Sequence, residues 1–369
     1  INKSQPELYL NENGNLKKTN FLENIDINAS VVNTADFDND GFEDIFIGSN
    51  SGYGSYGKSV DAMILINENG IGFSKATAYN KKLANLGMLY DVSIVDLDKD
   101  GLPDVVLAGH YMPITMLMNS GDGKFVKKEI RDSEGWWNSV AVEDLDGDGD
   151  YDIIAGNWGL NTRLKATLEK PLQLYLNDFD DNGRVDPILT YFDNGRETPL
   201  ATKDELTKQI PQLNKSFLSY KDFAKADFND YFSKEKIGQA ERKKVVTLET
   251  TIFENKGDLK FSKSEMPREV QFSSVHAILL TDLDEDGLKD LVIGGNNYHV
   301  NTQLGRQDAS KGLILKNKGN LNFDLIKNRL HINGAVKSIK NIKVLKENYL
   351  IFGINNSETE FVKYPRTND

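Results

Sequence analysis

Short apolar segments separated by polar turns dominate the chain, and none approaches the roughly 18 apolar residues that a membrane-spanning helix needs. Apolar runs such as 45–48 and 291–294 have the length of β-strands. One arrangement recurs five times: a short apolar run, an acidic stretch of nine residues and a second apolar run. This arrangement predicts pairs of antiparallel strands joined by acidic loops. Such regular recurrence also indicates a repeat architecture.

A second repeated element consists of Asn and Gly in a turn, followed shortly by Phe. It occurs at residues 67–73, 119–125, 255–261 and 317–323, with a truncated version at 8–14. Gly and Asn between strand-forming residues predict a β-hairpin. Each full repeat therefore predicts a four-stranded antiparallel sheet, made of the two strands around the acidic loop and this hairpin.

Residues 202–243 break the repeat and have the features of a helical segment. Thr202 and Glu205 fit a capping box. Leu213, Phe217 and Phe223 recur at helical spacing. We predict a short helical insertion within one sheet and not a separate domain.

These patterns predict an all-β protein, with residues 1–369 forming a single β-propeller domain of six or seven four-stranded antiparallel blades. The count is seven if residues 172–176 close one blade, and six if they open the next. The N-terminal hairpin is expected to supply outer strands to the blade begun by the C-terminal unit. An open β-solenoid is the alternative, but its repeats are shorter and lack long hairpins.

The acidic loops predict about five structural Ca²⁺ sites. Oxygen donors at positions 1, 3, 5 and 9, with a backbone carbonyl at position 7, can surround one hard cation at about 2.3–2.6 Å. Glycine at position 6 permits the sharp turn. The predicted ligands are Asp36, Asp38, Asp40, Phe42 and Asp44; Asp96, Asp98, Asp100, Leu102 and Asp104; Asp144, Asp146, Asp148, Asp150 and Asp152; Asp178, Asp180, Asn182, Arg184 and Asp186; and Asp282, Asp284, Asp286, Leu288 and Asp290.

Two other interpretations of these loops differ in the residues and flanking elements that they require. An EF-hand needs glutamate at position 12 and flanking helices, whereas position 12 here is apolar and the flanks are predicted strands. Plain solvated turns are the other alternative, and the fourth loop, with Asn182 and Arg184, fits them best. Clustered carboxylates without a cation would repel one another. Sites of this kind fill at extracellular calcium concentrations, which favours a location outside the cell.

Composition narrows the possible partners. The 369 residues carry a formal charge of −12 and contain no cysteine. An acidic chain is poorly suited to binding a phosphate backbone, so no nucleic-acid partner is expected. The absence of cysteine removes disulfides and thiolate chemistry. No export signal is recognisable at Ile1, so any lipid anchor is expected to lie in a segment not present here.

The acidic loops and Asn-Gly hairpins resemble the FG-GAP/VCBS repeats of integrin α-subunit-like propellers. The segments 135–139, 156–161, 171–186, 204–220 and 294–298 sharpen this resemblance towards VCBS-repeat proteins of Bacteroidota cell surfaces. Many of those proteins are associated with SusC/SusD-type nutrient uptake systems. The resemblance implies a non-enzymatic, calcium-stabilised binding or scaffold module on the outer-membrane surface, with a SusC/SusD-type protein or a glycan as partner.

Strand alternation predicts a ligand face. If acidic loops join first and second strands, all five metal sites lie on one face of the ring, and the segments at the other strand ends lie on the opposite face. Aromatic, amide and Arg side chains there suit carbohydrate or peptide contacts, although packing between blades explains them equally well. The candidates are Tyr53, Tyr56, His110, Tyr111, Trp136, Trp137, Asn157, Trp158, Asn161, Asn296, Asn297, Tyr298, His299 and Arg306.

The sequence offers little support for an enzyme. The chain has four histidines, and none lies in a His-Glu-x-x-His motif. No nucleophile elbow or phosphate-binding loop occurs either. We therefore expect no catalytic activity. A propeller-fold polysaccharide lyase or hydrolase remains the alternative function, with spare carboxylates as acid and base.

Overall fold

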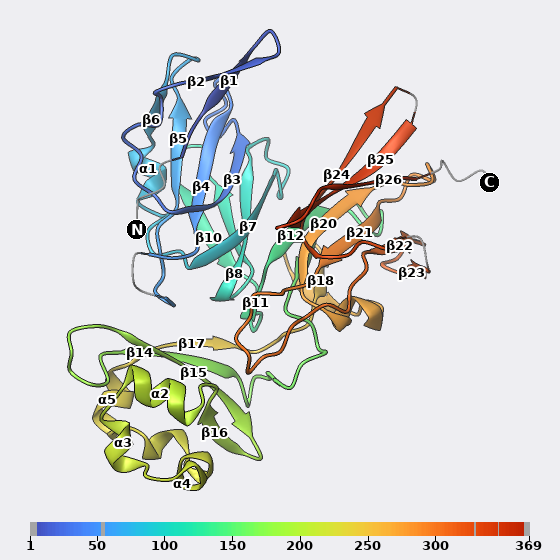
Figure 1. Cartoon of the computed structure of the whole chain (residues 1–369). Coiled ribbons are helices and arrows are strands. Elements are labelled where there is room, and N and C mark those ends of the chain that lie inside the picture. The colour runs from blue at the N-terminus through green and yellow to red at the C-terminus, as the bar shows by residue number, and fades with distance from the viewer. Residues whose placement is uncertain (1–5, 53–55, 328–329, 346, 365–369) are drawn as a thin grey trace.

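The computed structural model describes residues 6–52, 56–327, 330–345 and 347–364. Antiparallel sheets make up most of this part of the chain (Figure 1). The apolar runs of the sequence form its buried strands, such as Asp44–Ser49, in which every residue is buried. No helix in the described residues is long and apolar enough to cross a membrane.

The first two sheets have the predicted organisation, with an acidic loop between the first two strands and an Asn-Gly turn between the last two. In each sheet the four strands of the repeat pair in the order in which they follow one another in the sequence. The first sheet consists of β3 (Ala29–Ala35), β4 (Asp44–Ser49), β5 (Met63–Asn67) and β6 (Phe73–Lys75). After the short α1 (Thr77–Asn80), the second consists of β7 (Met88–Val95), β8 (Asp104–Met112), β9 (Thr115–Asn119) and β10 (Phe125–Glu129), and β11 (Gly135–Trp136) pairs with the end of β8.

The third sheet is assembled from two segments that are distant in sequence. Its strands are β12 (Ser139–Glu143), β13 (Asp152–Gly156), β18 (Thr251–Asn255) and β19 (Phe261–Ser264). β13 pairs directly with β18, with Ile154 opposite Ile252. Residues 157–250 therefore form an insertion between the second and third strands of this sheet.

The insertion contains a sheet of its own and all the helices of the 202–243 segment. The sheet has the order β16-β15-β14-β17. Its strands are β14 (Leu172–Asn177), β15 (Asp186–Asp193), β16 (Arg196–Pro199) and β17 (Glu241–Val245). Between β16 and β17 lie α2 (Lys203–Gln209), α3 (Leu213–Ser216), α4 (Tyr220–Lys225), η1 (Phe228–Asp230) and α5 (Lys234–Gln239). Thr202 and Glu205 form the expected capping box on α2.

The C-terminal part supplies the last two sheets. After η2 (Arg268–Phe272), the first of these two sheets consists of β20 (Val275–Thr281), β21 (Asp290–Gly295), β22 (Leu313–Asn317) and β23 (Phe323–Ile326). The last sheet has three strands, β24 (Ala335–Val344), β25 (Glu347–Asn355) and β26 (Glu360–Lys363).

The N-terminal hairpin does not extend the last sheet, contrary to expectation. β1 (Tyr9–Glu12) and β2 (Asn15–Lys18) form a separate two-stranded sheet. β26 already occupies the edge of the last sheet by pairing with β25. The segment after β2 instead packs on the first sheet, where Leu22 and Ile25 cover Ile45, Ile47 and Leu65.

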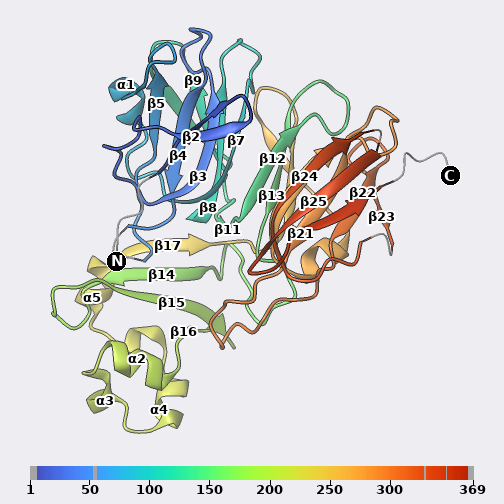
Figure 2. The same ribbon diagram turned by 45° about the horizontal axis from the view of Figure 1, so that its top comes forward.

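Five sheets follow one another in an arc. Their first strands are β3, β7, β12, β20 and β24, and each of these packs against the next. Separate apolar clusters fill the spaces between sheets; for example, Phe46 and Ile64 meet Leu89 and Leu107. In Figures 1 and 2 the first sheet (blue) and the last sheet (red) stand at opposite ends of this arc.

The all-β class and the repeated antiparallel sheets are confirmed, whereas a closed ring is not formed by the described residues. The number of blades stays a prediction. The sequence predicts that all five acidic loops belong to one series of sheets. This is wrong for the fourth loop, because it joins β14 to β15 in the inserted sheet. That sheet lies beside the arc and not within its series (Figure 1). The reason is that β13 finds its next neighbour in β18, beyond the insertion.

Candidate metal centres

Each acidic loop is closed by its first aspartate. In the first loop the Asp36 carboxylate accepts hydrogen bonds from the backbone N–H of Asp40 at 3.0 Å and of Gly41 at 2.8 Å. The corresponding pairs recur in the second, fourth and fifth loops. In the third loop Asp144 accepts from Gly147 and Gly149. The side chain thus bends the backbone into a tight turn without any partner from outside the loop.

Two positions of each loop have left-handed backbone. The glycine at position 6 has φ between 81° and 93° in all five loops, as its identity predicts. Position 4 also has positive φ, although it is occupied by Asn39, Lys99, Gly147, Asp181 and Glu285. Apart from glycine and asparagine, the residue types at position 4 do not predict a positive φ.

The turn brings three carboxylates of every loop together. Within each group, one oxygen from each residue lies within 4.8 Å of the others. In the first loop the group comes from positions 1, 3 and 5, and in the other four it comes from positions 1, 3 and 9. The groups are Asp36, Asp38 and Asp40; Asp96, Asp98 and Asp104; Asp144, Asp146 and Asp152; Asp178, Asp180 and Asp186; and Asp282, Asp284 and Asp290.

Position 7 also takes part in each loop through its backbone. The N–H of Phe42 donates to Asp40 at 2.9 Å, and that of Arg184 donates to Asn182 at 2.8 Å. The equivalent bond exists in the other three loops. The predicted ligand role of the position-7 carbonyl remains a prediction. The fourth loop, despite Asn182 and Arg184, keeps the same backbone arrangement.

The aspartate at position 9 differs from the others because it is buried and, in four of the loops, accepts backbone N–H groups from two different segments. In the second loop, Asp104 Oδ2 accepts from the N–H of Leu97 at 2.9 Å, and Oδ1 accepts from the N–H of Asn119 at 2.7 Å. Asp44, Asp152 and Asp290 make the equivalent bonds to position 2 and to the hairpin asparagine. This carboxylate therefore ties the acidic loop to the hairpin of the same sheet.

The hairpin asparagine, which the sequence pattern predicts as a turn residue, also bonds to a neighbouring loop. Asn119 Nδ2 donates to the carbonyl of Phe37 in the first loop at 2.9 Å, and Asn317 Nδ2 donates to the carbonyl of Leu145 in the third loop at 2.9 Å. These bonds join one sheet to the loop of its neighbour. The signal was present in the sequence, since the asparagine recurs at the start of every full hairpin repeat.

Helical residues replace the hairpin at the fourth loop. Gln209 Nε2 donates to Asp186 Oδ1 at 3.4 Å. In the other four loops the backbone N–H of the hairpin asparagine donates to the equivalent oxygen. Lys236 Nζ donates to the carbonyl of Asp178 at 2.7 Å and pairs with Asp181. The insertion therefore supports its own loop with side chains from α2 and α5.

The electrostatics of the loops favour a cation. Burial raises the pKa of Asp44, Asp104 and Asp152 to about 6, against the lowering effect of their backbone hydrogen bonds. Burial, followed by the charges of Asp40 and Asp36, raises the pKa of Asp38. A bound cation would offset both the desolvation and the mutual repulsion.

The donor sets also fit a cation geometrically. The buried Oδ1 atoms of Asp180 and Asp284 have no hydrogen-bond partner among the described residues. A buried oxygen left unpaired is unfavourable, and a metal ion would satisfy it. At the fifth loop the Lys316 ammonium contacts Asp284 and lies 3.4 Å from Asp286. A cation there has to displace this ammonium, so we expect the fifth site to be the weakest.

Six of the fourteen predicted ligand-face residues are buried. Tyr111, Trp136, Trp137, Asn157, Trp158 and Asn296 are at most 6% exposed. Trp136 and Trp158 stack edge to face and pack on Leu172 and Leu174 of the inserted sheet. Trp137 packs with Phe253 between the second and third sheets. Packing between sheets, the alternative given for these residues, therefore accounts for the three tryptophans, and a ligand-binding role of the face stays a prediction.

Two of the remaining candidates contact this buried group: the Tyr56 and Tyr111 hydroxyls lie 3.1 Å apart, and the His110 ring packs against Tyr111 and Trp136. Tyr56, Asn161, His299 and Arg306 are exposed. The Arg306 guanidinium lies 3.8 Å from the centre of the half-buried Tyr298 ring. His110 and Asn297 line a cavity with other residues, and Tyr53 lies outside the described residues.

Comparison with known proteins supports the repeat. Residues 96–155 match the FG-GAP-like repeat. This segment runs from the second acidic loop to β13, so it contains both the second and the third metal loops. No match was found among curated proteins.

Two solved structures show a weak likeness to this chain. BBS1N in complex with ARL6DN has 9% identity and a TM-score of 0.35, covering 98% of this chain and 88% of that one. The V. cholerae biofilm matrix protein Bap1 has 10% identity and a TM-score of 0.37, covering 96% of this chain and 72% of that one. At these values neither likeness assigns a function.

The left-handed glycine of the second loop predicts a measurable cost. An alanine Cβ at Gly101 would meet no atom within 4 Å, but φ there is +91°. We expect Gly101→Ala to lower the free energy of unfolding by roughly 1–2 kcal/mol through backbone strain alone. Gly238→Ala, in helix α5 with equally open space, should instead raise stability by roughly 0.5–1 kcal/mol. Urea unfolding gives the free energy of unfolding of both variants. Equal changes in the two would contradict the role of the left-handed backbone at Gly101.

The inter-sheet asparagine gives a second prediction. Asn317→Ala leaves the buried Leu145 carbonyl without the bond it receives. Stability should fall by roughly 1–3 kcal/mol. Asn322→Ala, at an exposed position of the same turn, should change it by less than about 0.5 kcal/mol. Thermal unfolding followed by circular dichroism compares the stability of the two variants. An Asn317→Ala variant as stable as the unmodified protein would contradict a stabilising role of the bond to Leu145.

Proposed function

We propose that the protein is a non-enzymatic, calcium-stabilised binding or scaffold module of the FG-GAP repeat type, located at a cell surface. The observation that carries the proposal is the recurrence of one three-carboxylate group in five separate loops. Aspartates grouped in this way at one exposed turn could be accidental. A three-carboxylate group in all five loops, built from positions 1, 3 and 9 in four of them, with unpartnered buried oxygens in two loops, favours ion binding.

Calcium fits these groups better than other common metals. The donors are carboxylate oxygens, with no cysteine in the chain and no histidine in the groups. Hard oxygen donors in flexible loops suit Ca²⁺, whereas Mg²⁺ demands near-ideal octahedral geometry and retains several waters. The ions would hold the paired carboxylates of each loop and stiffen the strand pairs on either side.

A surface location and its partners form the second part of the proposal. Extracellular calcium modules bind at roughly 10⁻⁴–10⁻³ M, concentrations that are not reached in cytosol. The resemblance to VCBS-repeat proteins of Bacteroidota adds an outer-membrane location and a SusC/SusD-type or glycan partner. Isolation of the native membrane complex, followed by identification of its subunits, tests this part. Recovery of the protein from a soluble intracellular fraction would count against it.

Calcium removal should destabilise the protein. A site with a Kd of roughly 10⁻⁴ M contributes about 2.7 kcal/mol at 10 mM Ca²⁺ by mass action. With several sites, we expect the melting temperature to rise by well over 5 °C between excess EDTA and 10 mM Ca²⁺. Differential scanning calorimetry measures it, with 10 mM Mg²⁺ as the control that gives a smaller shift. An unchanged melting temperature would refute the metal sites.

Two aspartates of the second loop should separate ion binding from framework support. Asp98 belongs to the carboxylate group at position 3, so Asp98→Asn should reduce only the calcium-dependent part of the stability. Asp104 also accepts two backbone N–H groups. Asp104→Asn places an amide NH₂ against one of these donors and should lower stability by roughly 1–3 kcal/mol even in EDTA. Identical behaviour of the two variants in EDTA would contradict this division of roles.

A further inference from the structure

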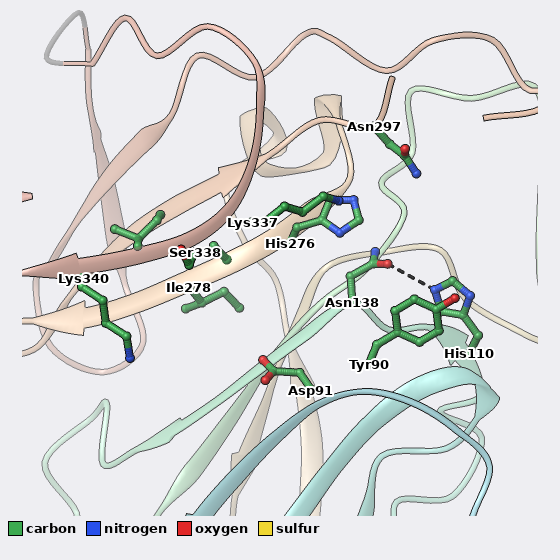
Figure 3. A pocket seen from close by; sticks show the side chains of 12 residues that line it. Tyr90, Asp91, His110, Asn138, His276, Ile278, Asn297, Lys337, Ser338 and Lys340 are labelled. Atoms are coloured by element: carbon green, nitrogen blue, oxygen red, sulfur yellow. Dashed lines mark hydrogen bonds between the residues drawn. The ribbon is translucent and has the colours of Figure 1, made fainter. Parts of the chain in front are cut away.

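A cavity of about 440 Å³ lies where the first strands of neighbouring sheets converge. Its walls come from β7, β8, β20 and β24, with side chains from the segments after β11 and β21 (Figure 3). Tyr90, His276 and Lys337 lie near the beginnings of β7, β20 and β24, and the acidic loops of β7 and β20 follow the other ends of those strands. The cavity is therefore distinct from the metal loops.

Three of the lining residues are the extra residues of β-bulges. The strand register shifts between Leu89 and Asp91, between Val275 and Ala277, and between Val336 and Ser338. The residues inserted at these points are Tyr90, His276 and Lys337, and all three line the cavity. Bulges re-aim single side chains and are frequent beside binding sites. Three strands from three sheets thus use the same device to direct a polar or aromatic group into one space.

Asn138 presents an unsatisfied donor to this cavity. It is only 7% exposed, and its Oδ1 accepts a hydrogen bond from His110 Nε2 at 3.2 Å. Its buried Nδ2 has no partner among the described residues. In Figure 3 this nitrogen points across the cavity towards the side that carries His276. Leaving a buried donor unpaired is unfavourable, so an acceptor from a ligand would gain by filling the position.

The cavity carries positive charge in an otherwise acidic protein. Burial lowers the pKa of His110 to about 4, and burial together with the Lys337 ammonium and His110 lowers that of His276 to about 3. Both imidazoles are therefore neutral at pH 7. Burial raises the pKa of Asp91 to about 6, against the lowering effect of the N–H groups of Val140 and Val92, which donate to its carboxylate, and of Lys340. Lys337 and Lys340 thus line the cavity with one carboxylate, whereas the whole chain has a charge of −12; burial lowers the pKa of the Lys337 ammonium.

We propose that this cavity binds a small hydroxylated carboxylate, of the class that a hexuronic acid unit represents. The Lys337 ammonium would pair with the ligand carboxylate, and the Asn138 amide would donate to a hydroxyl or ring oxygen. Asp91 lines the same space and can accept hydroxyl protons. The Tyr90 and His110 rings stack with centroids 3.8 Å apart and offer an aromatic wall to the apolar face of a sugar ring.

The size of the cavity agrees with such a ligand. Small-molecule sites commonly have volumes of about 300–1,000 Å³ and combine apolar walls with a few fixed polar groups. Ile278 and Ala277 supply apolar surface here, beside the polar groups already named. The proposal deepens the proposed binding function and rests on it, but it does not depend on calcium being the metal in the loops.

Isothermal titration of the intact protein with D-glucuronate, D-glucose and inorganic phosphate tests the ligand class. Every titration contains the same calcium concentration, because uronates also bind calcium. We expect saturable binding of glucuronate and at least about tenfold weaker binding of glucose. Equal affinity for glucose would overturn the role of the carboxylate, binding of phosphate alone would overturn the sugar class, and no binding of glucuronate would overturn the proposal.

Variants on β24 locate the site. Lys337→Met should weaken glucuronate binding at least about tenfold, and Lys337→Arg should restore most of it. Lys343→Met is the matched control, because this exposed lysine lies on the same strand and does not line the cavity. Equal loss in both methionine variants, or no loss in Lys337→Met, would refute the site. Calcium-dependent melting, measured on the same samples, separates a failure here from a failure of the metal sites.

Discussion

In each sheet of the arc that carries a metal loop, one buried carboxylate accepts a backbone N–H from the loop and another from the hairpin of the same sheet. Asp104 illustrates it, with Leu97 of the loop on one oxygen and Asn119 of the hairpin on the other. Removing such a buried acceptor leaves two donors unpaired, which is more costly than losing a surface contact. The asparagine then extends the connection to the loop of the preceding sheet. Sheet, loop and neighbour are thus joined by short polar bonds around the apolar clusters that separate the sheets.

Local features of this protein could be predicted from the sequence because their causes are local. The Asn-Gly hairpins, the acidic loops and the capping box at Thr202 depend on residues a few positions apart. The placement of the fourth loop depends on β13 pairing with β18, far away in sequence. Periodicity carries no information about such a partner. For the same reason Trp136 and Trp158 were expected at a surface, although they support the inserted sheet.

The bulges explain why the cavity could not be found by motif. Tyr90, His276 and Lys337 are unrelated residue types in different repeats. They meet only because a one-residue shift turns each of them to the same side of its strand. Asn138 completes the group from a connecting segment held by His110. The repeats thus share one strand arrangement, whereas the residues that line the cavity differ in type from one repeat to the next.

The interruption of the third sheet has a consequence for how the chain is made. During synthesis β12 and β13 emerge long before β18, and β13 then has an open edge where Ile154 should meet Ile252. Residues 157–250 can build their own sheet and helical core in that interval. Exposed strand edges in incomplete chains invite association with other chains. The edge of β13 therefore stays open until residues 157–250 and then β18 have been synthesised and β18 has paired with it.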